Sequence, residues 1–200
     1  MTDSKNNPIN PAEFPIVYNF PNCRTTYKNF EGRKNEYNDA GQKTFSIRIS
    51  EEEALHRFPM GYDAYGEIVY GPGLIDQGLN VKPMPHREDE INPDWHLPVS
   101  IRYDPDFPSR NPGVTMISTD TNGRPVHTSL NEFSIGLIDR ADVIEYNVAV
   151  RIHNWKKNGK SGRKAYLRNM DVTVYQDCVE KRRALLQQDE FGEDDEVEAI

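Results

Sequence analysis

Long hydrophobic runs are missing from this sequence: nowhere do eighteen apolar residues follow one another, and residues 1–14 contain no apolar stretch. A membrane span needs about 20 apolar residues, and a secretory signal needs an apolar segment of about 7–15 residues. We therefore expect neither membrane insertion nor secretion, and we expect the protein in the cytoplasm.

Cysteine is scarce as well. Cys23 and Cys178 belong to no C-x-x-C spacing, which argues against a disulfide framework or a zinc ribbon and favours buried free thiols. The histidines show no H-x-x-x-H or H-E-x-x-H spacing, and the phosphate-loop and nucleophile-elbow motifs are absent. These absences predict a protein that is not an enzyme and holds no cofactor or metal.

Loop aspartates leave one catalytic alternative open, a metal-dependent nuclease. Carboxylates of this kind could bind Mg²⁺, although solvated loop carboxylates are more common. The candidates are Asp63, Asp76, Asp89, Asp94, Asp104 and Asp106.

Charge is distributed unevenly along the chain. The net charge is −8, but residues 184–200 hold seven acids and no base, which leaves 24 bases and 25 acids in residues 1–183. Residues 151–168 contain seven cations and no acid. The body is therefore nearly neutral with one basic segment, a distribution that is compatible with a nucleic-acid partner.

The apolar pattern predicts strands. Hydrophobic residues make up 36% of the chain, which also has 14 prolines, so we expect a modest core with long polar loops. Apolar and polar residues alternate, or β-branched and aromatic residues gather, in several segments. The expected strands lie at 16–30, 44–50, 79–83, 97–103, 114–119 and in a long hairpin at 143–175.

Helices should be few and short. Ser50 precedes three glutamates, an N-cap pattern that predicts a helix to about Phe58, and residues 131–142 could hold a second helical turn. We predict an all-β or β-rich fold: one domain at 16–183, built as a small OB-like barrel with long loop insertions, including an irregular insertion around 59–95. Residues 1–15 are expected to form a flexible arm, and residues 184–200 a disordered acidic tail.

The hairpin turn is the first candidate binding site. An unpaired nucleic-acid strand requires cations for its phosphates and flat side chains that stack on its bases. The predicted contacts are Trp155, Lys156, Lys157, Lys160, Arg163, Lys164 and Tyr166. The alternative is an ordinary solvated turn with Trp155 folded back onto the sheet.

The loop that follows the first strands is the second candidate. Phe30 and Phe45 are expected in the core, whereas neighbouring polar and aromatic residues remain available for contacts. Small OB barrels bind strands with a sheet face and two mobile loops, so the two loops support each other. The predicted contacts here are Lys28, Arg33, Lys34, Tyr37 and Lys43.

The acidic tail admits two interpretations. It could be a solubilising terminus. It could instead compete with nucleic acid for the basic loops, or dock on replication or recombination proteins with Phe191, Val197 and Ile200 as apolar anchors.

Two segments, residues 27–47 and 141–174, resemble the single-stranded DNA-binding proteins of tailed bacteriophages. The first matches a pattern R-N-F-x-G, Tyr/Phe-Asn and G-x-[RK]-x-F at Asn29, Phe30, Gly32, Tyr37, Asn38, Gly41, Lys43 and Phe45. The second matches W-x-x-N-G-K-x-G-x-K-A-Y-L at Trp155, Asn158, Gly159, Lys160, Gly162, Lys164, Ala165, Tyr166 and Leu167. Lys28 stands where that family has Arg, and residues 59–77 look like an insertion relative to it.

This resemblance implies an OB-like fold that binds and protects single-stranded DNA in phage replication or recombination, in the host cytoplasm, without catalysis. It leaves the oligomeric state and the preference for DNA over RNA open. The alternative function is a phage protein-interaction or host-inhibitory module that acts through an acidic surface, which the net charge of −8 supports.

Overall fold

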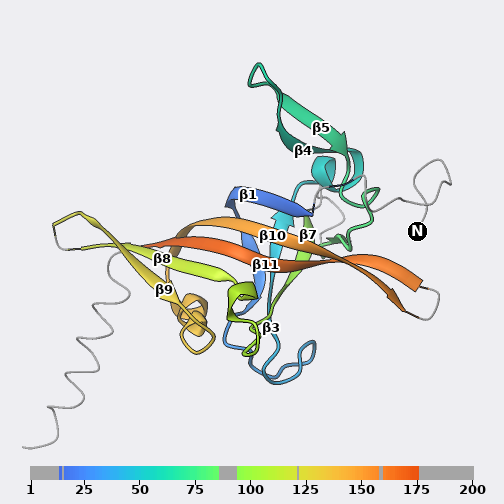
Figure 1. The fold of residues 1–200 in the computed structure, drawn as a ribbon. Coiled ribbons are helices and arrows are strands. Elements are labelled where there is room, and N and C mark those ends of the chain that lie inside the picture. Colours follow the sequence, from blue (N-terminus) through green and yellow to red (C-terminus); the bar gives the residue numbers. More distant parts are fainter. Residues whose placement is uncertain (1–13, 15, 86–93, 121, 158–159, 176–200) are drawn as a thin grey trace, which may run out of the picture.

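The computed structural model describes residues 14, 16–85, 94–120, 122–157 and 160–175. Within these ranges the protein consists mainly of β-strands joined by loops and short helical turns, so the prediction of a β-rich fold is confirmed (Figure 1). The acidic tail, and the N-terminal arm apart from Phe14, lie outside the described residues. No helix in the described ranges is long and apolar enough to cross a membrane.

Each expected segment contains at least one strand. In chain order the strands are β1 (Val17–Cys23), β2 (Thr25–Asn29), β3 (Lys43–Ile49), β4 (Arg57–Tyr62), β5 (Ile68–Pro72), β6 (Lys82–Pro83), β7 (Trp95–Ile101), β8 (Gly113–Thr119), β9 (Pro125–Leu130), β10 (Val143–Lys157) and β11 (Lys160–Val174). Of these, β4, β5 and β9 lie outside the expected segments. Three short helical turns accompany them: η2 (Glu52–His56), η3 (Pro108–Arg110) and η4 (Ile135–Arg140).

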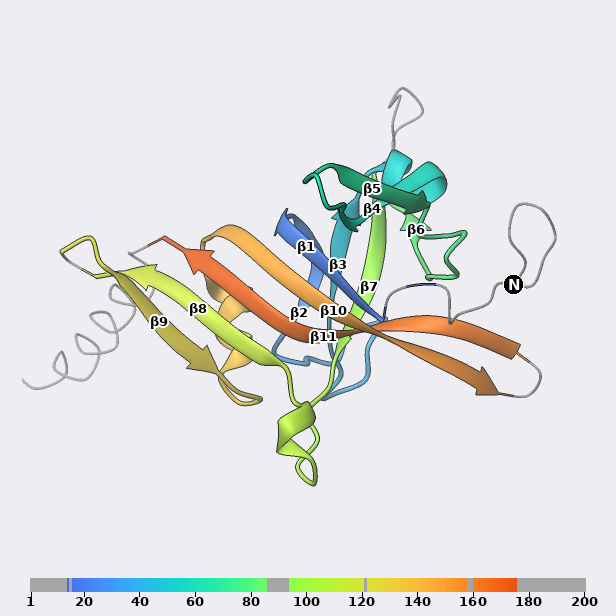
Figure 2. The ribbon, with the colours of Figure 1, turned by 45° about the horizontal axis from the view of Figure 1, so that its top comes forward.

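Nine strands form one mixed sheet, whose main path runs β1-β10-β11-β7-β3-β2. Strand β11 is its branch point, because Ala165 and Tyr166 pair in parallel with β7 while residues 169–173 pair in parallel with β8. The β8–β9 hairpin therefore extends away from the β7–β3 side of the sheet (Figures 1 and 2). The pairings among the described residues do not close this sheet into a ring.

The long hairpin predicted at 143–175 is confirmed as β10–β11. Its ladder runs from Val143 paired with Val174 to Lys157 paired with Lys160, with register shifts near residues 143–145 and 149–150. The end of the hairpin projects beyond the rest of the sheet (Figure 2).

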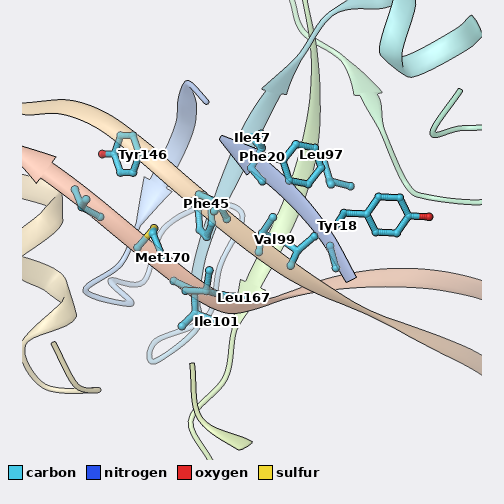
Figure 3. Packing of buried hydrophobic residues seen from close by; sticks show 14 of the residues in the cluster. Tyr18, Phe20, Phe45, Ile47, Leu97, Val99, Ile101, Tyr146, Leu167 and Met170 are labelled. Carbon is cyan, nitrogen blue, oxygen red and sulfur yellow. The ribbon is translucent and has the colours of Figure 1, made fainter. Parts of the chain in front are cut away.

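The core lies on one side of the curled sheet, where side chains from β1, β3, β7, β10 and β11 meet (Figure 3). Alternation explains its composition, because Phe45, Ile47 and Ile49 of β3 all point inward and are buried. Phe30 stacks on Phe45 with ring centroids 5.2 Å apart, which confirms that both belong to the core.

Ser50 makes the hydrogen bonds predicted for it, although the N-cap position of η2 is Glu51, and the helix is short. Ser50 Oγ accepts a hydrogen bond from the Glu53 amide at 3.2 Å, and the Glu53 carboxylate accepts one from the Ser50 amide at 3.0 Å. This reciprocal pair spans the start of η2 at Glu52. The chain then turns into β4 at Arg57 instead of continuing as a helix to Phe58.

The stretch around 59–95, which the sequence pattern left irregular, contains a separate two-stranded sheet of β4 and β5. Its glycines interrupt the apolar pattern because they serve close packing. A Cβ at Gly73 would lie 2.5 Å from the Leu55 carbonyl carbon, and one at Gly71 would lie 2.8 Å from Met60 Cγ. Gly66 adopts a φ of +83° in the connecting turn. The same residues that look like chain breakers therefore allow this hairpin to form.

Candidate nucleic-acid interface

The hairpin β10–β11 has two chemically different faces. Side chains alternate along a strand, and paired residues of antiparallel neighbours share a face. Ile152 pairs with Ala165 on the core side, where both are buried. On the opposite side three pairs follow one another: Arg151 with Tyr166, His153 with Lys164, and Trp155 with Gly162. We call these six positions the outer face.

The ring side chains of the outer face contact their neighbours. The centroids of His153 and Tyr166 lie 6.3 Å apart in an edge-to-face arrangement, and Lys164 Nζ lies 5.3 Å from the Tyr166 centroid. The Trp155 indole lies across Gly162, where an added Cβ would come within 2.8 Å of Cζ2. Because 39% of Trp155 nevertheless remains exposed, the indole is both positioned by the backbone and accessible to a ligand.

The same side of the sheet continues onto β7. Tyr166 aligns with Ser100, and His96 lies four residues earlier in β7, so alternation places it on the same side. The Tyr27 ring lies 5.0 Å from the His96 ring and is about half exposed, while His96 Nδ1 lies 3.1 Å from Ser46 Oγ. Burial lowers the pKa of His96, with a smaller contribution from the charge of Lys82. Aromatic rings therefore occur along both β7 and the hairpin.

Arg163 has a different environment from the other predicted cations, because it is 4% exposed. One of its terminal nitrogens donates to the Gln77 carbonyl at 2.9 Å and to the Tyr18 hydroxyl at 3.4 Å, and Nε donates to Asn154 Oδ1 at 3.2 Å. Burial raises the pKa of Tyr18, and the nearby guanidinium partly offsets this effect. Arg163 therefore joins the hairpin to the segment that follows β5, and it does not lie on the outer face.

Of the remaining hairpin lysines, the structure describes the side chain of Lys156 alone. Lys156 pairs with Ser161, so it lies on the same side as the buried Arg163, beyond the core. Lys157 and Lys160 close the described ladder with their backbones, and their side chains lie outside the described part of the structure.

The loop between β2 and β3 is organised by Glu31. Arg33 Nε donates to the Glu31 carboxylate at 2.6 Å, and Arg140 reaches the same group at 3.4 Å. The hydrogen bond from Arg33 is the main cause that lowers the pKa of Glu31. Lys43 Nζ donates to the Glu31 carbonyl at 3.0 Å. Two of the predicted loop contacts, Arg33 and Lys43, are thus partly engaged within the protein.

The other predicted loop contacts are exposed. Tyr37 is 84% exposed, and Lys28 and Lys34 make no ion pair with any residue that the structure describes. Lys43 begins β3 opposite Ile101 of β7, two strands from β11, which corresponds to roughly 10 Å at the usual strand spacing. The base of this loop contacts the core and η4, because Phe30 stacks on Phe45 and the Glu31 amide donates to the Asp139 carboxylate.

Three outer-side residues were not among the predicted contacts: Arg151, His153 and Arg168. Arg151 and His153 belong to the outer face, and Arg168 is exposed two residues beyond Tyr166. The sequence could have indicated them, because side chains along a strand alternate between its two faces. Once residues 158 and 159 are taken as the turn, this alternation places positions 151, 153 and 155 beside 166, 164 and 162.

The described residues form no metal site of the kind that the nuclease alternative requires. No group of three or more His, Cys, Asp or Glu side chains in these ranges is arranged to hold a metal ion. Cys23 is a free, partly buried thiol, and burial raises its pKa to about 11. Cys178 lies outside the described residues.

Comparison with known proteins adds one finding. A family model described as "Putative phage ssDNA-binding domain" matches residues 66–198, which include the β10–β11 hairpin. The first resembling segment, residues 27–47, lies outside this match, whereas the second, residues 141–174, lies within it. No curated protein matches the chain significantly.

Proposed function

Since the chain belongs to the family of putative phage ssDNA-binding domains, we propose that it binds single-stranded DNA on the outer face of β10–β11 and catalyses no reaction. The observation that carries this proposal is the outer face itself. Arg151 and Lys164 stand among the rings of His153, Trp155 and Tyr166, and no acid occurs between residues 151 and 168.

The physical fit is to an unpaired strand. Cations neutralise phosphates, and exposed rings stack on bases at about 1–3 kcal/mol per base regardless of sequence. Bases in a duplex are already stacked on one another, so the rings could not contribute there. Weak sequence preference and a clear preference for single strands follow.

The loop between β2 and β3 extends this interface. Lys28, Lys34 and Tyr37 are exposed and would contact nucleotides beyond those bound by the hairpin. Arg33 and Lys43 would contribute by positioning this loop through Glu31. Arg163 is left out of the contact set because it is buried.

In the cell, we place this activity in phage DNA replication or recombination in the host cytoplasm, where exposed single strands need protection. The acidic segment 184–200 would serve contacts with replication or recombination proteins. These roles rest on family membership and on the composition of the tail.

Fluorescence anisotropy with a labelled oligo-dT and a matched duplex tests the proposal, with protein titrated at several salt concentrations. Each neutralised phosphate contributes about 0.7 to the log-log salt dependence on single strands, so Arg151, Lys164 and Arg168 together should contribute about −2 to the slope. Lys164→Ala should weaken binding, whereas Arg124→Ala, an exposed control in the β8–β9 turn, should not. Equal affinity for the duplex, or no binding to oligo-dT at low salt, would contradict the proposal.

A further inference from the structure

A groove of about 520 Å³ lies between the β7–β8 loop and the hairpin β10–β11. Four arginines line it, two from each side: Arg102 and Arg110 from the loop, Arg151 and Arg168 from the strands. All four are exposed. This gathers four arginines from parts of the chain that are about fifty residues apart.

These arginines have no acidic partners in the described part of the chain. Arg33, Arg48, Arg57 and Arg140 form ion pairs there, and none of the groove arginines does. The one acid that lines the groove is Asp104, whose Oδ1 accepts the amides of Asp106 and Phe107 at 3.1 and 3.3 Å. Asp104 thus stabilises its own turn, and the groove keeps an excess of positive charge that favours an anion.

The loop side of the groove is held in place before any ligand binds. Asn111 Oδ1 accepts the Asp104 amide at 2.7 Å, which closes the loop on itself. The Arg110 guanidinium carbon lies 4.3 Å from the centroid of the Phe107 ring. Preorganised guanidinium groups lose less entropy on binding and present a fork that matches a phosphate.

The groove is continuous with the outer face, because His153 and Tyr166 also line it. A base that stacks on these rings would carry its neighbouring phosphates over the arginines. We infer that this groove binds consecutive backbone phosphates of the DNA strand, so that the strand passes from the rings of the hairpin into the space beneath η3. The inference rests on the proposed function and adds the route of the strand.

The groove suits a continuous strand better than a free nucleotide. Its four cations would exceed the charge of a nucleoside monophosphate, and its opening onto Tyr166 leaves a path for the next nucleotide. A strand supplies one negative charge per phosphate along the whole groove.

The test compares two probes of equal length: oligo-dT and an abasic deoxyribose-phosphate oligomer, which keeps the phosphates and lacks the bases. Arg102→Ala/Arg110→Ala removes the loop side of the groove without altering a paired strand. We expect this double variant to weaken both probes by a similar factor of about ten or more, and to reduce the salt slope by about 1.4. Trp155→Ala should weaken oligo-dT alone, and Arg124→Ala should weaken neither.

The outcomes separate the two proposals. If the wild-type protein does not bind oligo-dT, the proposed function fails. If it binds oligo-dT and the double variant keeps the wild-type affinity and salt slope for both probes, the groove inference is wrong while the function stands. The double variant Arg102→Lys/Arg110→Lys controls for misfolding, because it keeps both positive charges. It should show most of the salt slope that the double alanine variant loses. Saturation of the groove by thymidine monophosphate with a one-to-one loss of oligo-dT binding would point to a nucleotide site instead.

Discussion

Arg163 and Lys164 are adjacent cations with opposite predicted roles, and exchanging each for alanine separates them. Arg163 is buried and donates to Gln77, Asn154 and Tyr18, whereas Lys164 is exposed on the outer face. Arg163→Ala should therefore lower the free energy of unfolding, and Lys164→Ala should lower DNA affinity.

The magnitude follows from the hydrogen bonds that Arg163→Ala removes. Leaving a buried acceptor such as the Gln77 carbonyl without its donor costs about 1–3 kcal/mol, and the cavity left by the shortened side chain adds to this. Relief from burying a guanidinium offsets part of the cost. A net decrease of about 2–4 kcal/mol in the free energy of unfolding results. With a urea m-value of about 2 kcal/mol/M, the midpoint should fall by about 1–2 M.

The expectation for Lys164→Ala is the reverse. Its contact with Tyr166 is an exposed cation–π pair worth about 0.5–1 kcal/mol at most, so the urea midpoint should change little. The salt slope for oligo-dT should fall by about 0.7, the contribution of one phosphate. Arg163→Met is the matched control for Arg163→Ala. It keeps most of the aliphatic volume and removes the hydrogen bonds, so it separates the loss of hydrogen bonds from the cavity.

Urea denaturation followed by circular dichroism, and anisotropy under conditions where every variant is folded, measure the two effects. The reasoning would be refuted if Arg163→Ala kept the wild-type urea midpoint but weakened DNA binding with a smaller salt slope. That result would place Arg163 on the binding surface and reverse the assignment of faces.

Three further outcomes are expected. Gly162→Ala should displace the Trp155 indole, because its Cβ would lie 2.8 Å from the ring, and tryptophan fluorescence should shift as oligo-dT affinity falls; an unchanged spectrum would contradict this contact. Because the pKa of His96 is lowered in the folded protein, the unfolded chain binds a proton more readily. The free energy of unfolding should therefore fall as the pH drops below the ordinary value of 6.5. The urea midpoint of His96→Gln should fall less over this pH range than that of the wild-type protein. Deleting residues 184–200 removes seven acids and should leave oligo-dT binding unchanged or stronger at low salt; a loss of binding would favour an acidic interaction module.

The sequence predicted local structure well where one pattern dominated. Alternation identified β3, β7, β8 and the long hairpin, and it placed Phe30 and Phe45 in the core. The β4–β5 hairpin was not predicted because Gly61 and Gly71 interrupt its strands and Gly73 follows them. Gly71 packs against Met60, and Gly73 packs against the η2 backbone. The parallel pairing of β11 with β7 and β8 has no local signal, since its partners are about fifty or more residues away.

For the candidate site, composition located the hairpin but did not sort its residues by face. Trp155, Lys164 and Tyr166 share the outer face by alternation, a rule available from the sequence once the turn is fixed. The burial of Arg163 was not available in this way, because Tyr18 and Gln77 lie 145 and 86 residues from it in the chain. Whether the sorted residues contact DNA stays a prediction.

The most direct test of the central claim is photo-crosslinking of a bromodeoxyuridine-substituted oligo-dT to the full chain, followed by mass spectrometry of the crosslinked peptides. We predict crosslinks in residues 151–168, at Trp155 and Tyr166 above all. The β4–β5 hairpin provides an internal comparison, because its Tyr62, Tyr65 and Tyr70 are more exposed than Trp155. Crosslinks confined to those tyrosines, with none between 151 and 168, would contradict a binding surface on β10–β11.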